Sequence, residues 1–301
     1  MKQFETVTLR AGDWEAEIIP GIGMNTASLT FQGTPVLRSP ESPEFLRLDP
    51  CVYGTPLLMP PNRTEAGRFS FDGKSYQLPV NETVLGNHLH GLVHSQEFTL
   101  VQVQGNMLSG IYENRGEIFP FPFRLEVNCI LTEEGYAQEF LFTNTGSSDM
   151  PLTFGLHTVF SCPGEIRVPI GKRWTVNSCF IPTGELEELT PENECYRTGT
   201  DPNGKMVRGF YTSCGNEAKI GDFRYRVTPD FDQWVLWNGD GTSGFCAVEP
   251  MRGAVNSLNS GVGLLRLKPG ETHRFATIIY RAPLKTPLLW SGQIFCSNFA
   301  L

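Results

Sequence analysis

The sequence lacks any long apolar run. No stretch approaches the ~20 consecutive apolar residues that a membrane-spanning helix requires, and the start, Met1 to Thr6, has no charged-then-apolar leader pattern. The eight cysteines are spread over 301 residues, and none of them form the close pairs of a zinc knuckle or a redox motif. We therefore expect a cytoplasmic protein with reduced cysteines and no contact with a membrane.

Low-complexity linkers, blocks of like charge and repeats of solenoid or propeller length are also missing. The simplest organisation is therefore one domain that covers residues 1–301. Basic residues are scarce as well, because 24 lysines and arginines stand against 32 aspartates and glutamates, a formal net charge of −8. This balance argues against a broad nucleic-acid-binding surface.

Sustained helical periodicity is absent, and short alternating or apolar runs between turn residues recur instead. The 31 glycines, 22 prolines and 21 phenylalanines favour strands and turns over long helices. We predict an all-β protein whose one plausible helical turn is Glu185 to Leu189. So many strands exceed a comfortable open sheet, and a large two-sheet β-sandwich is expected. The clearest predicted strands are Trp14 to Ile19, Met107 to Glu113, Phe123 to Leu131, Ala137 to Asn144, Leu152 to Phe160, Phe223 to Thr228, Trp234 to Trp237, Phe245 to Glu249 and His273 to Tyr280.

One carboxylate stands out among the predicted strands. Glu249 is the only acid in the apolar run Gly244 to Pro250. Pro250 cannot donate to a central ladder and restricts the preceding residue to extended backbone, so we expect the strand to end here. A buried acid is usually paired, neutralised or catalytic. The simpler interpretation of Glu249 is a buried salt bridge to Arg252 or Arg63.

A single imidazole marks another strand. Alternation along Leu152 to Phe160 puts His157 on the face opposite the large apolar side chains. The ordinary interpretation is a packed histidine that bonds to a neighbouring backbone group. An acid and an imidazole on separate strands also suggest a general acid/base pair, formed here by Glu249 and His157.

Three of the five histidines gather between Asn87 and His94. Two imidazoles separated by one residue on a strand share a face, which is an arrangement that binds metals in cupin-type sites. Such a site also needs a well-spaced carboxylate, and Glu97 is only loosely placed. The interpretation that competes with a metal site is one or two solvent-facing histidines in a polar loop, and we therefore predict no metal site. The cluster lies within residues 46–98, the longest segment without a clean strand pattern, and such segments commonly carry function.

The segment Pro61 to Phe69 contains two arginines, Arg63 and Arg68. A guanidinium fork bonds vicinal hydroxyls, carboxylates or phosphates. Surface arginines are common, however, and Arg68 also fits an exposed position beside an edge strand. On its own this segment does not define a function.

Taken together, these segments resemble the aldose 1-epimerase (galactose mutarotase) family, in its bacterial branch, over nearly the whole chain. Each motif is weak alone, whereas their order and spacing are specific. The motifs are Asn62-Arg63, Gly67-Arg68-Phe69, Asp72-Gly73, Leu89-His90-Gly91, Phe119 to Leu125, His157, and Val248-Glu249-Pro250-Met251 followed by Asn256 to Gly261.

The resemblance implies a large antiparallel two-sheet β-sandwich, the galactose mutarotase-like supersandwich, with a sugar bound in a groove on one curved sheet. It further implies that Glu249 is the general base and His157 the general acid. His90 and Arg63 would bind the sugar or stabilise charge, and Asn62 is a further candidate for its hydroxyls. The expected partner is a small-molecule sugar, and no cofactor is implied; the sequence does not specify the sugar or the oligomeric state.

The chemistry explains why these residue types suit the reaction. Anomer interconversion removes the proton from the C1 hydroxyl and protonates the ring oxygen, so that the ring opens. A carboxylate suits the first step, and an imidazole with an unperturbed pKa of about 6.5 suits the second. Trp234, Trp237 or Phe160 would offer an apolar face to the sugar ring.

The sequence departs from the family pattern in three places. His157 is followed by Thr158-Val159-Phe160 where the family has proline, tyrosine and phenylalanine, and Leu92 stands at a usual glycine. The family's sugar-binding aspartate has no match, since Asp232 lies too near Glu249 in the sequence.

Two other functions therefore stay open. The first is an epimerase of a phosphorylated or other anionic hexose, with Arg63, Arg68 and Arg252 forming a basic pocket. The second is a carbohydrate-binding β-sandwich without catalysis, which keeps the groove but not a productive acid/base geometry.

Overall fold

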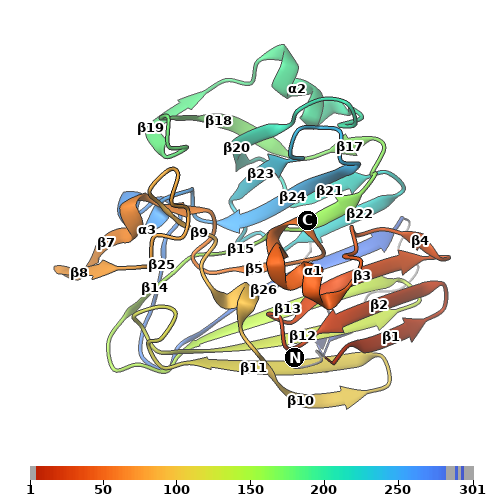
Figure 1. The fold of residues 1–301 in the computed structure, drawn as a ribbon, viewed down its shortest axis with the longest axis horizontal. Helices are drawn as coiled ribbons and strands as arrows, with labels where there is room; N and C mark the ends of the chain where they lie inside the picture. The colour runs from red at the N-terminus through yellow and green to blue at the C-terminus, as the bar shows by residue number, and fades with distance from the viewer. Residues whose placement is uncertain (1–4, 283–288, 291–292, 295–301) are drawn as a thin grey trace.

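A computed structural model describes residues 5–282, 289–290 and 293–294. Strands dominate it, and two eight-stranded antiparallel sheets pack face to face (Figure 1). Within the described ranges, no helix has the length and apolar character that crossing a bilayer would need. The predicted all-β sandwich is confirmed.

The first large sheet contains the longest strands. Its order is β10 (Thr99–Gln104), β11 (Met107–Asn114), β12 (Phe123–Thr132), β13 (Gly135–Asn144), β26 (Thr272–Arg281), β22 (Phe223–Val227), β21 (Glu217–Ile220) and β17 (Ile166–Arg167).

The second large sheet carries Glu249. Its order is β19 (Pro182–Glu187), β18 (Ile170–Val176), β20 (Arg208–Ser213), β23 (Gln233–Trp237), β24 (Phe245–Arg252), β15 (Phe154–Leu156) and β5 (Leu57–Leu58), and β16 (Val159–Ser161) also pairs with β24.

Smaller elements surround these sheets. A four-stranded sheet comprises β1 (Val7–Ala11), β2 (Trp14–Ile19), β3 (Asn25–Phe31) and β4 (Thr34–Pro35). Two-stranded pairs are β6 (Arg63–Thr64) with β9 (His88–Leu89), β7 (Arg68–Phe71) with β8 (Lys74–Gln77), β14 (Met150–Leu152) with β25 (Leu265–Leu267), and β27 (Leu289–Trp290) with β28 (Gln293–Ile294). The helices are α1 (Pro43–Leu48), α2 (Pro191–Thr198) and α3 (Ser257–Ser260), and the 3₁₀ turns are η1 (Pro50–Val52), η2 (Glu65–Gly67) and η3 (Val93–Ser95).

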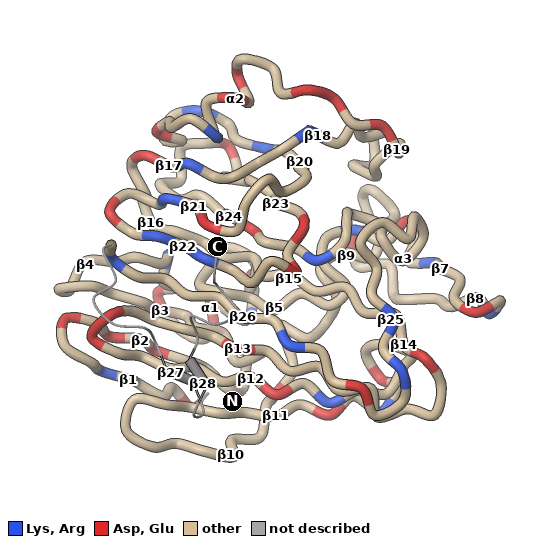
Figure 2. The backbone as a smooth tube through the Cα atoms, turned by 180° about the vertical axis from the view of Figure 1, so that it is seen from behind, with Lys and Arg blue, Asp and Glu red and all other residues tan. Residues whose placement is uncertain are grey.

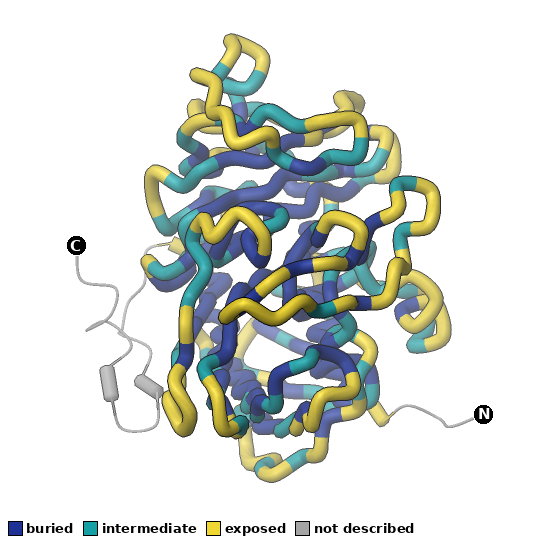
Figure 3. The backbone as a smooth tube through the Cα atoms, turned by 90° about the vertical axis from the view of Figure 1, so that its left-hand side faces the viewer, coloured by how far each residue is buried: buried dark blue, intermediate teal, exposed yellow. Residues whose placement is uncertain are grey.

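Aromatic side chains fill the space between the two large sheets. The rings of Phe140 in β13 and Phe154 in β15 lie 5.1 Å apart, and those of Phe160 in β16 and Tyr225 in β22 lie 5.4 Å apart. All four are buried, and burying such a ring contributes roughly 1.5–3 kcal/mol. Figure 3 shows the resulting buried layers, with exposed residues concentrated in the turns. Figure 2 shows that lysines and arginines are interspersed with acidic residues along the backbone.

The predicted helical turn at Glu185 to Leu189 is wrong. Residues up to Glu187 belong to β19, because Leu186 pairs with Trp174 of β18 across a hairpin. Helix-favouring residue types yield here to strand pairing. The two longer helices begin elsewhere, α1 at Pro43 after Ser42 and α2 at Pro191 after Thr190. Proline is favoured at the first position of a helix because its missing N–H would be unpaired anyway.

The expectation that the strand ends at Pro250 is also wrong, since β24 continues to Arg252. The N–H of Val248 donates to Thr158 O, and strand alternation directs the nitrogen of Pro250 to the same side. On that side β24 pairs with β16 through Ala247 and with β15 from Met251 onward. Pro250 therefore faces the interval between two short strands, where no ladder hydrogen bond is lost.

That interval also interrupts the predicted strand from Leu152 to Phe160. Instead of one strand, this segment of the chain forms β14, β15 and β16, and His157 lies between β15 and β16. The backbone N–H of His157 donates to Pro56 O at 3.0 Å. The backbone hydrogen bonds at this break fix His157 beside the middle of β24.

Candidate active site

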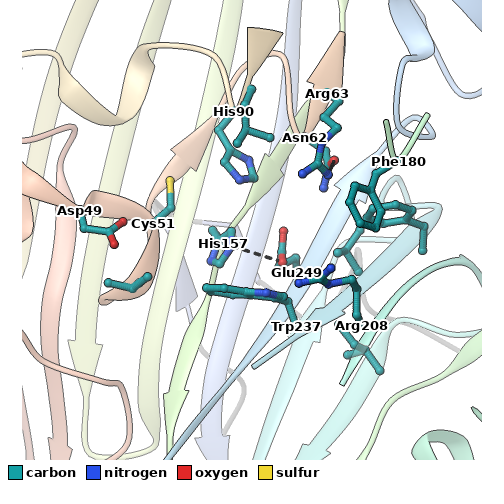
Figure 4. Close-up of a pocket in the computed structure, with 15 residues that line it drawn as sticks. Asp49, Cys51, Asn62, Arg63, His90, His157, Phe180, Arg208, Trp237 and Glu249 are labelled. Carbon is teal, nitrogen blue, oxygen red and sulfur yellow. Dashed lines mark hydrogen bonds and ion pairs between the residues drawn. The ribbon is translucent and has the colours of Figure 1, made fainter. Parts of the chain in front are cut away.

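A pocket of about 370 Å³ opens on the second large sheet (Figure 4). All five residues proposed from the sequence line it, although they are separated by up to 187 positions along the chain (249 − 62). The residues that line it include Asp49, Cys51, Asn62, Arg63, His90, His157, Phe180, Arg208, Trp237 and Glu249.

Glu249 projects into the pocket from β24, opposite Val235 of β23. It is only 1% exposed, and its Oε2 has no hydrogen-bond partner within the described part of the chain. Burial raises the pKa of Glu249 to about 8, and the positive charge of Arg63 opposes this rise. A carboxyl in this environment exchanges its proton near neutral pH, as a general acid or base requires.

His157 lies directly beside this carboxyl. Its Nε2 is 3.4 Å from Oε1 of Glu249 (Figure 4). Burial lowers the pKa of His157 to about 4. The two shifts have the same cause, because a low-dielectric environment disfavours both the carboxylate and the imidazolium. Between these pKa values the pair holds one exchangeable proton, which resides on Glu249.

Neither arginine suggested as a partner for Glu249 forms an ion pair with it in the described residues. Arg252 lies 3.7 Å from Asp232, outside the pocket. Arg63 instead binds Glu82, with its Nε and Nη2 donating to the carboxylate at 2.6–3.1 Å. The simple salt-bridge interpretation of Glu249 is therefore wrong.

The segment from residue 46 to 98 supplies the opposite side of the pocket. Pairing of β6 with β9 sets Arg63 against Leu89, and the N–H of His90 donates to Asn62 O at 2.7 Å. Asn62 and His90 both have left-handed backbone, with φ of 53° and 65°. Gly91 follows because a Cβ there would lie 2.0 Å from Met59 O. These contacts direct the side chains of Asn62, Arg63 and His90 into the same cavity.

His90 packs against His157. Its ring meets the ring of His157 edge to face, with centroids 5.3 Å apart. Burial, together with the neighbouring imidazoles and Arg63, holds the pKa of His90 well below its usual range. A neutral imidazole at this position can donate one hydrogen bond and accept another, which suits contact with a sugar hydroxyl.

The histidine segment does not have the geometry proposed for a metal. The positive φ of His90 breaks the extended backbone that would place His88 and His90 on one face. Nδ1 of His88 instead lies 2.7 Å from Pro79 O. No cluster of three or more histidine, cysteine, aspartate or glutamate side chains with metal-binding geometry occurs in the ranges that the structure describes.

Several lining residues were missed from the sequence. Phe180 reaches the pocket from the turn between β18 and β19, where its φ is 58°, and no sequence pattern marked that turn as functional. Arg208 of β20 pairs with Trp237 of β23, so the alternation of β20 could have indicated its direction. Among the three aromatic candidates, Trp237 lines the pocket, whereas Trp234 and Phe160 are completely buried in the core.

The basic pocket suggested for an anionic hexose is wrong in its membership. Arg68 is directed to Gln77, whose Oε1 accepts from Arg68 Nε at 3.0 Å. Arg252 donates to the backbone oxygen of Asp230 and lies 3.7 Å from the carboxylate of Asp232. Neither lines the pocket. Arg63 does, and the second pocket arginine is Arg208.

Comparison with known proteins agrees with this fold. A galactose mutarotase-like protein from Clostridium acetobutylicum superposes with a TM-score of 0.86 at 25% identity, over 92% of this chain and 95% of that chain. Galactose 1-epimerase from Lactobacillus acidophilus superposes with a TM-score of 0.75 at 15% identity, over 91% of this chain and 93% of that one. The architecture is therefore that of the mutarotase-like β-sandwiches.

The aldose 1-epimerase family model matches residues 5–280, and the chain belongs to this family. The uncharacterized protein YihR of Escherichia coli K12 is 27% identical over 294 residues, which cover 92% of this chain and 93% of the relative. Family membership implies an isomerase with a sugar as its substrate.

Proposed function

We propose that this protein is a mutarotase, which interconverts the α and β anomers of a free aldose. The observation that carries the proposal is the 3.4 Å contact between His157 Nε2 and Glu249 Oε1, deep in one pocket. Burial brings the pKa of the acid up to about 8 and that of the imidazole down to about 4. Groups with such perturbed pKa values in a cleft are typical of catalytic sites.

In the proposed reaction, the Glu249 carboxylate takes the proton of the C1 hydroxyl while His157 delivers a proton to the ring oxygen. The bond between C1 and the ring oxygen breaks, and C1 becomes an aldehyde. After rotation about the C1–C2 bond, the hydroxyl formed from the ring oxygen attacks the other face of the aldehyde. Its proton returns to His157, and Glu249 returns its proton to the oxygen on C1. The two residues then stand in their starting protonation states.

The reaction starts with His157 protonated and Glu249 ionised. Burial favours the opposite state, in which His157 is neutral and Glu249 carries the proton. The proton therefore has to cross the 3.4 Å contact when the sugar binds. The charge of Arg63 lowers the pKa of Glu249, and sugar hydroxyls that donate to the carboxylate would act in the same direction.

The remaining pocket residues would orient the sugar. Asn62, Arg63 and His90 offer donors and acceptors for its hydroxyls, and Trp237 offers an apolar surface beside His157, with ring centroids 5.6 Å apart. Ring opening by proton transfer changes no oxidation state, so we propose that it proceeds without a cofactor. We also propose that residues 1–301 form one domain, because the family match spans residues 5–280.

Polarimetry on freshly dissolved aldoses would test this function. The wild-type protein should accelerate the approach to anomeric equilibrium for at least one aldose. Glu249→Gln and His157→Ala should each remove most of this acceleration, whereas Glu188→Gln and His273→Ala, outside the pocket, should retain it. Calorimetric binding of a sugar without any acceleration would instead identify a non-catalytic carbohydrate-binding protein.

A further inference from the structure

Arg208 is a pocket residue that the reaction proposed above does not use. It pairs across β20 and β23 with Trp237, and directly paired residues project from the same face of a sheet. Figure 4 shows its guanidinium directed into the pocket. Arg208 is exposed, so a ligand in the pocket can reach it.

The two pocket arginines differ in their partners. Arg63 is held by the carboxylate of Glu82, with both side chains about 15% exposed, and its charge is thereby balanced. Arg208 has no acidic partner in the part of the chain described, and its guanidinium carbon lies 5.1 Å from the centre of the Phe180 ring. Arg63 lies 5.0 Å from the same ring. Arg208 thus presents a positive charge that the protein itself does not neutralise.

The position of Arg208 relative to Glu249 indicates which end of a sugar it would contact. Glu249 pairs with Val235, and Val235 pairs with Phe210; Arg208 is two residues from Phe210 on the same face. Two strand spacings and two residue rises separate the Cα atoms of Glu249 and Arg208 by about 12 Å. A sugar with C1 at Glu249 would therefore point its opposite end toward Arg208.

Other charges in the pocket do not cancel this one. In the sugar-free pocket Glu249 is protonated up to a pH of about 8 because burial raises its pKa, and in the proposed reaction its carboxylate is balanced by the protonated His157, 3.4 Å away. Asp49 lies on the far side of His157 from Arg208 (Figure 4). The positive charge of Arg208 consequently acts at the end of the pocket opposite Glu249 and His157, away from C1 of the sugar.

We propose that the substrate is a hexose with an anionic substituent, a carboxylate or a phosphate, on the carbon farthest from C1, and that Arg208 binds this group. The inference rests on the proposed mutarotase function for the placement of C1. A guanidinium forms strong charge-assisted hydrogen bonds with both kinds of anion. Phe180, which contacts the guanidiniums of Arg63 and Arg208, would keep the Arg208 fork from collapsing onto the protein surface.

Exchange rates for a neutral hexose, a hexuronate and a hexose 6-phosphate would test the proposal. The wild-type protein should show a higher kcat/KM for one of the two anionic sugars than for the neutral one. Arg208→Gln should lower the ratio of anionic to neutral kcat/KM by about 10- to 100-fold, mainly through KM. Arg208→Lys should restore part of the ratio, and Arg68→Gln, outside the pocket, should leave it unchanged.

Binding of methyl glycosides, in which C1 cannot open, separates this proposal from the catalytic one. Calorimetry should show tighter binding of the methyl glycoside of the anionic sugar than of its neutral counterpart, with the difference lost in Arg208→Gln. If the wild type accelerates no sugar but this binding difference appears, mutarotation fails and the anion site stands. If neutral and anionic sugars react and bind alike in both proteins, the anion site is refuted and mutarotation stands.

Discussion

Two halves of the pocket are built in different ways. The sheet-borne half comprises His157, Arg208, Trp237 and Glu249, which are placed by β15, β16, β20, β23 and β24. The loop-borne half comprises Asn62, Arg63, His90 and Phe180, three of which have positive φ. Proton transfer tolerates little misplacement, and here both proposed proton-transfer residues are on the paired strands or in the break between them. The proposed sugar contacts come from both halves, with Asn62, Arg63 and His90 in the loop-borne half and Trp237 and Arg208 in the sheet-borne half.

The difference between the halves lies in how each handles charge. In the sheet-borne half, burial shifts the pKa values of Glu249 and His157 in opposite directions and favours their neutral forms. In the loop-borne half, the charge of Arg63 is balanced by the carboxylate of Glu82. Desolvation thus sets the protonation of the proposed catalytic pair, whereas ion pairing fixes an orienting group.

The largest expected effect is on catalysis by the sheet-borne half. Glu249→Gln and His157→Ala should each lower kcat by about 10²–10⁴-fold. The double variant should be little worse than either single variant, because the two residues act as one unit. Exchange kinetics of the three variants would measure this. Losses that multiply in the double variant would mean that the residues act independently.

The next effect is on stability as a function of pH. Folded Glu249 keeps its proton up to a pH of about 8, whereas the unfolded chain loses it near the ordinary glutamate pKa of 4.5. Stability from this group is therefore fully present below pH 4.5 and decreases as the pH rises through 8. Glu249→Gln has no such proton to lose, so its free energy of unfolding should rise relative to wild type over this range, by up to roughly 5 kcal/mol.

Urea denaturation at pH 5 and pH 9 would measure this difference. Exposed Glu188→Gln serves as the control, since it removes a carboxylate from the surface. An equal gap between wild type and Glu249→Gln at both pH values would show that the Glu249 carboxyl is not desolvated.

A smaller effect is expected when the loop-borne half loses its ion pair. Glu82→Ala leaves the charge of Arg63 without its partner in a site that is only 15% exposed, and should cost about 3 kcal/mol of stability. It should also raise KM, because Arg63 would no longer be oriented. The exposed pair of Arg10 and Glu15 offers a matched control, for which Glu15→Ala should cost less than about 1 kcal/mol.

The smallest effect is expected at Trp237. Trp237→Phe keeps an aromatic ring but reduces its area, and should raise KM only a few-fold. Titration of sugar into wild type and variant, followed by exchange kinetics, would check this. A large fall in kcat with unchanged KM would instead place Trp237 in the proton-transfer step.

The sheet-borne half was largely predictable from the sequence because strands have a strict alternation. Glu249 stood out as a lone acid in an apolar run, and the period of two separated His157 from Phe154 and Leu156, which the structure buries in the core. The error at Pro250 arose because the effect of a proline depends on its partner strand, and the sequence did not reveal the break between β15 and β16.

The loop-borne half was predictable only through the family resemblance. Arg63 and His90 belong to recognisable motifs, but the role of Glu82 as the partner of Arg63 depends on how an irregular segment folds back. Phe180 lies at a turn whose direction depends on Asn87, which donates to both Glu82 and Cys179 O. Contacts of this kind have no period along the chain from which they could be predicted.

Saturation-transfer NMR between the two anomers of a sugar at equilibrium measures the proposed reaction most directly. We predict strong transfer with wild-type protein and transfer near the uncatalysed level with Glu249→Gln, measured on folded variant protein that still binds the sugar. Undiminished transfer with folded Glu249→Gln and His157→Ala would contradict the assignment of proton transfer to this pair.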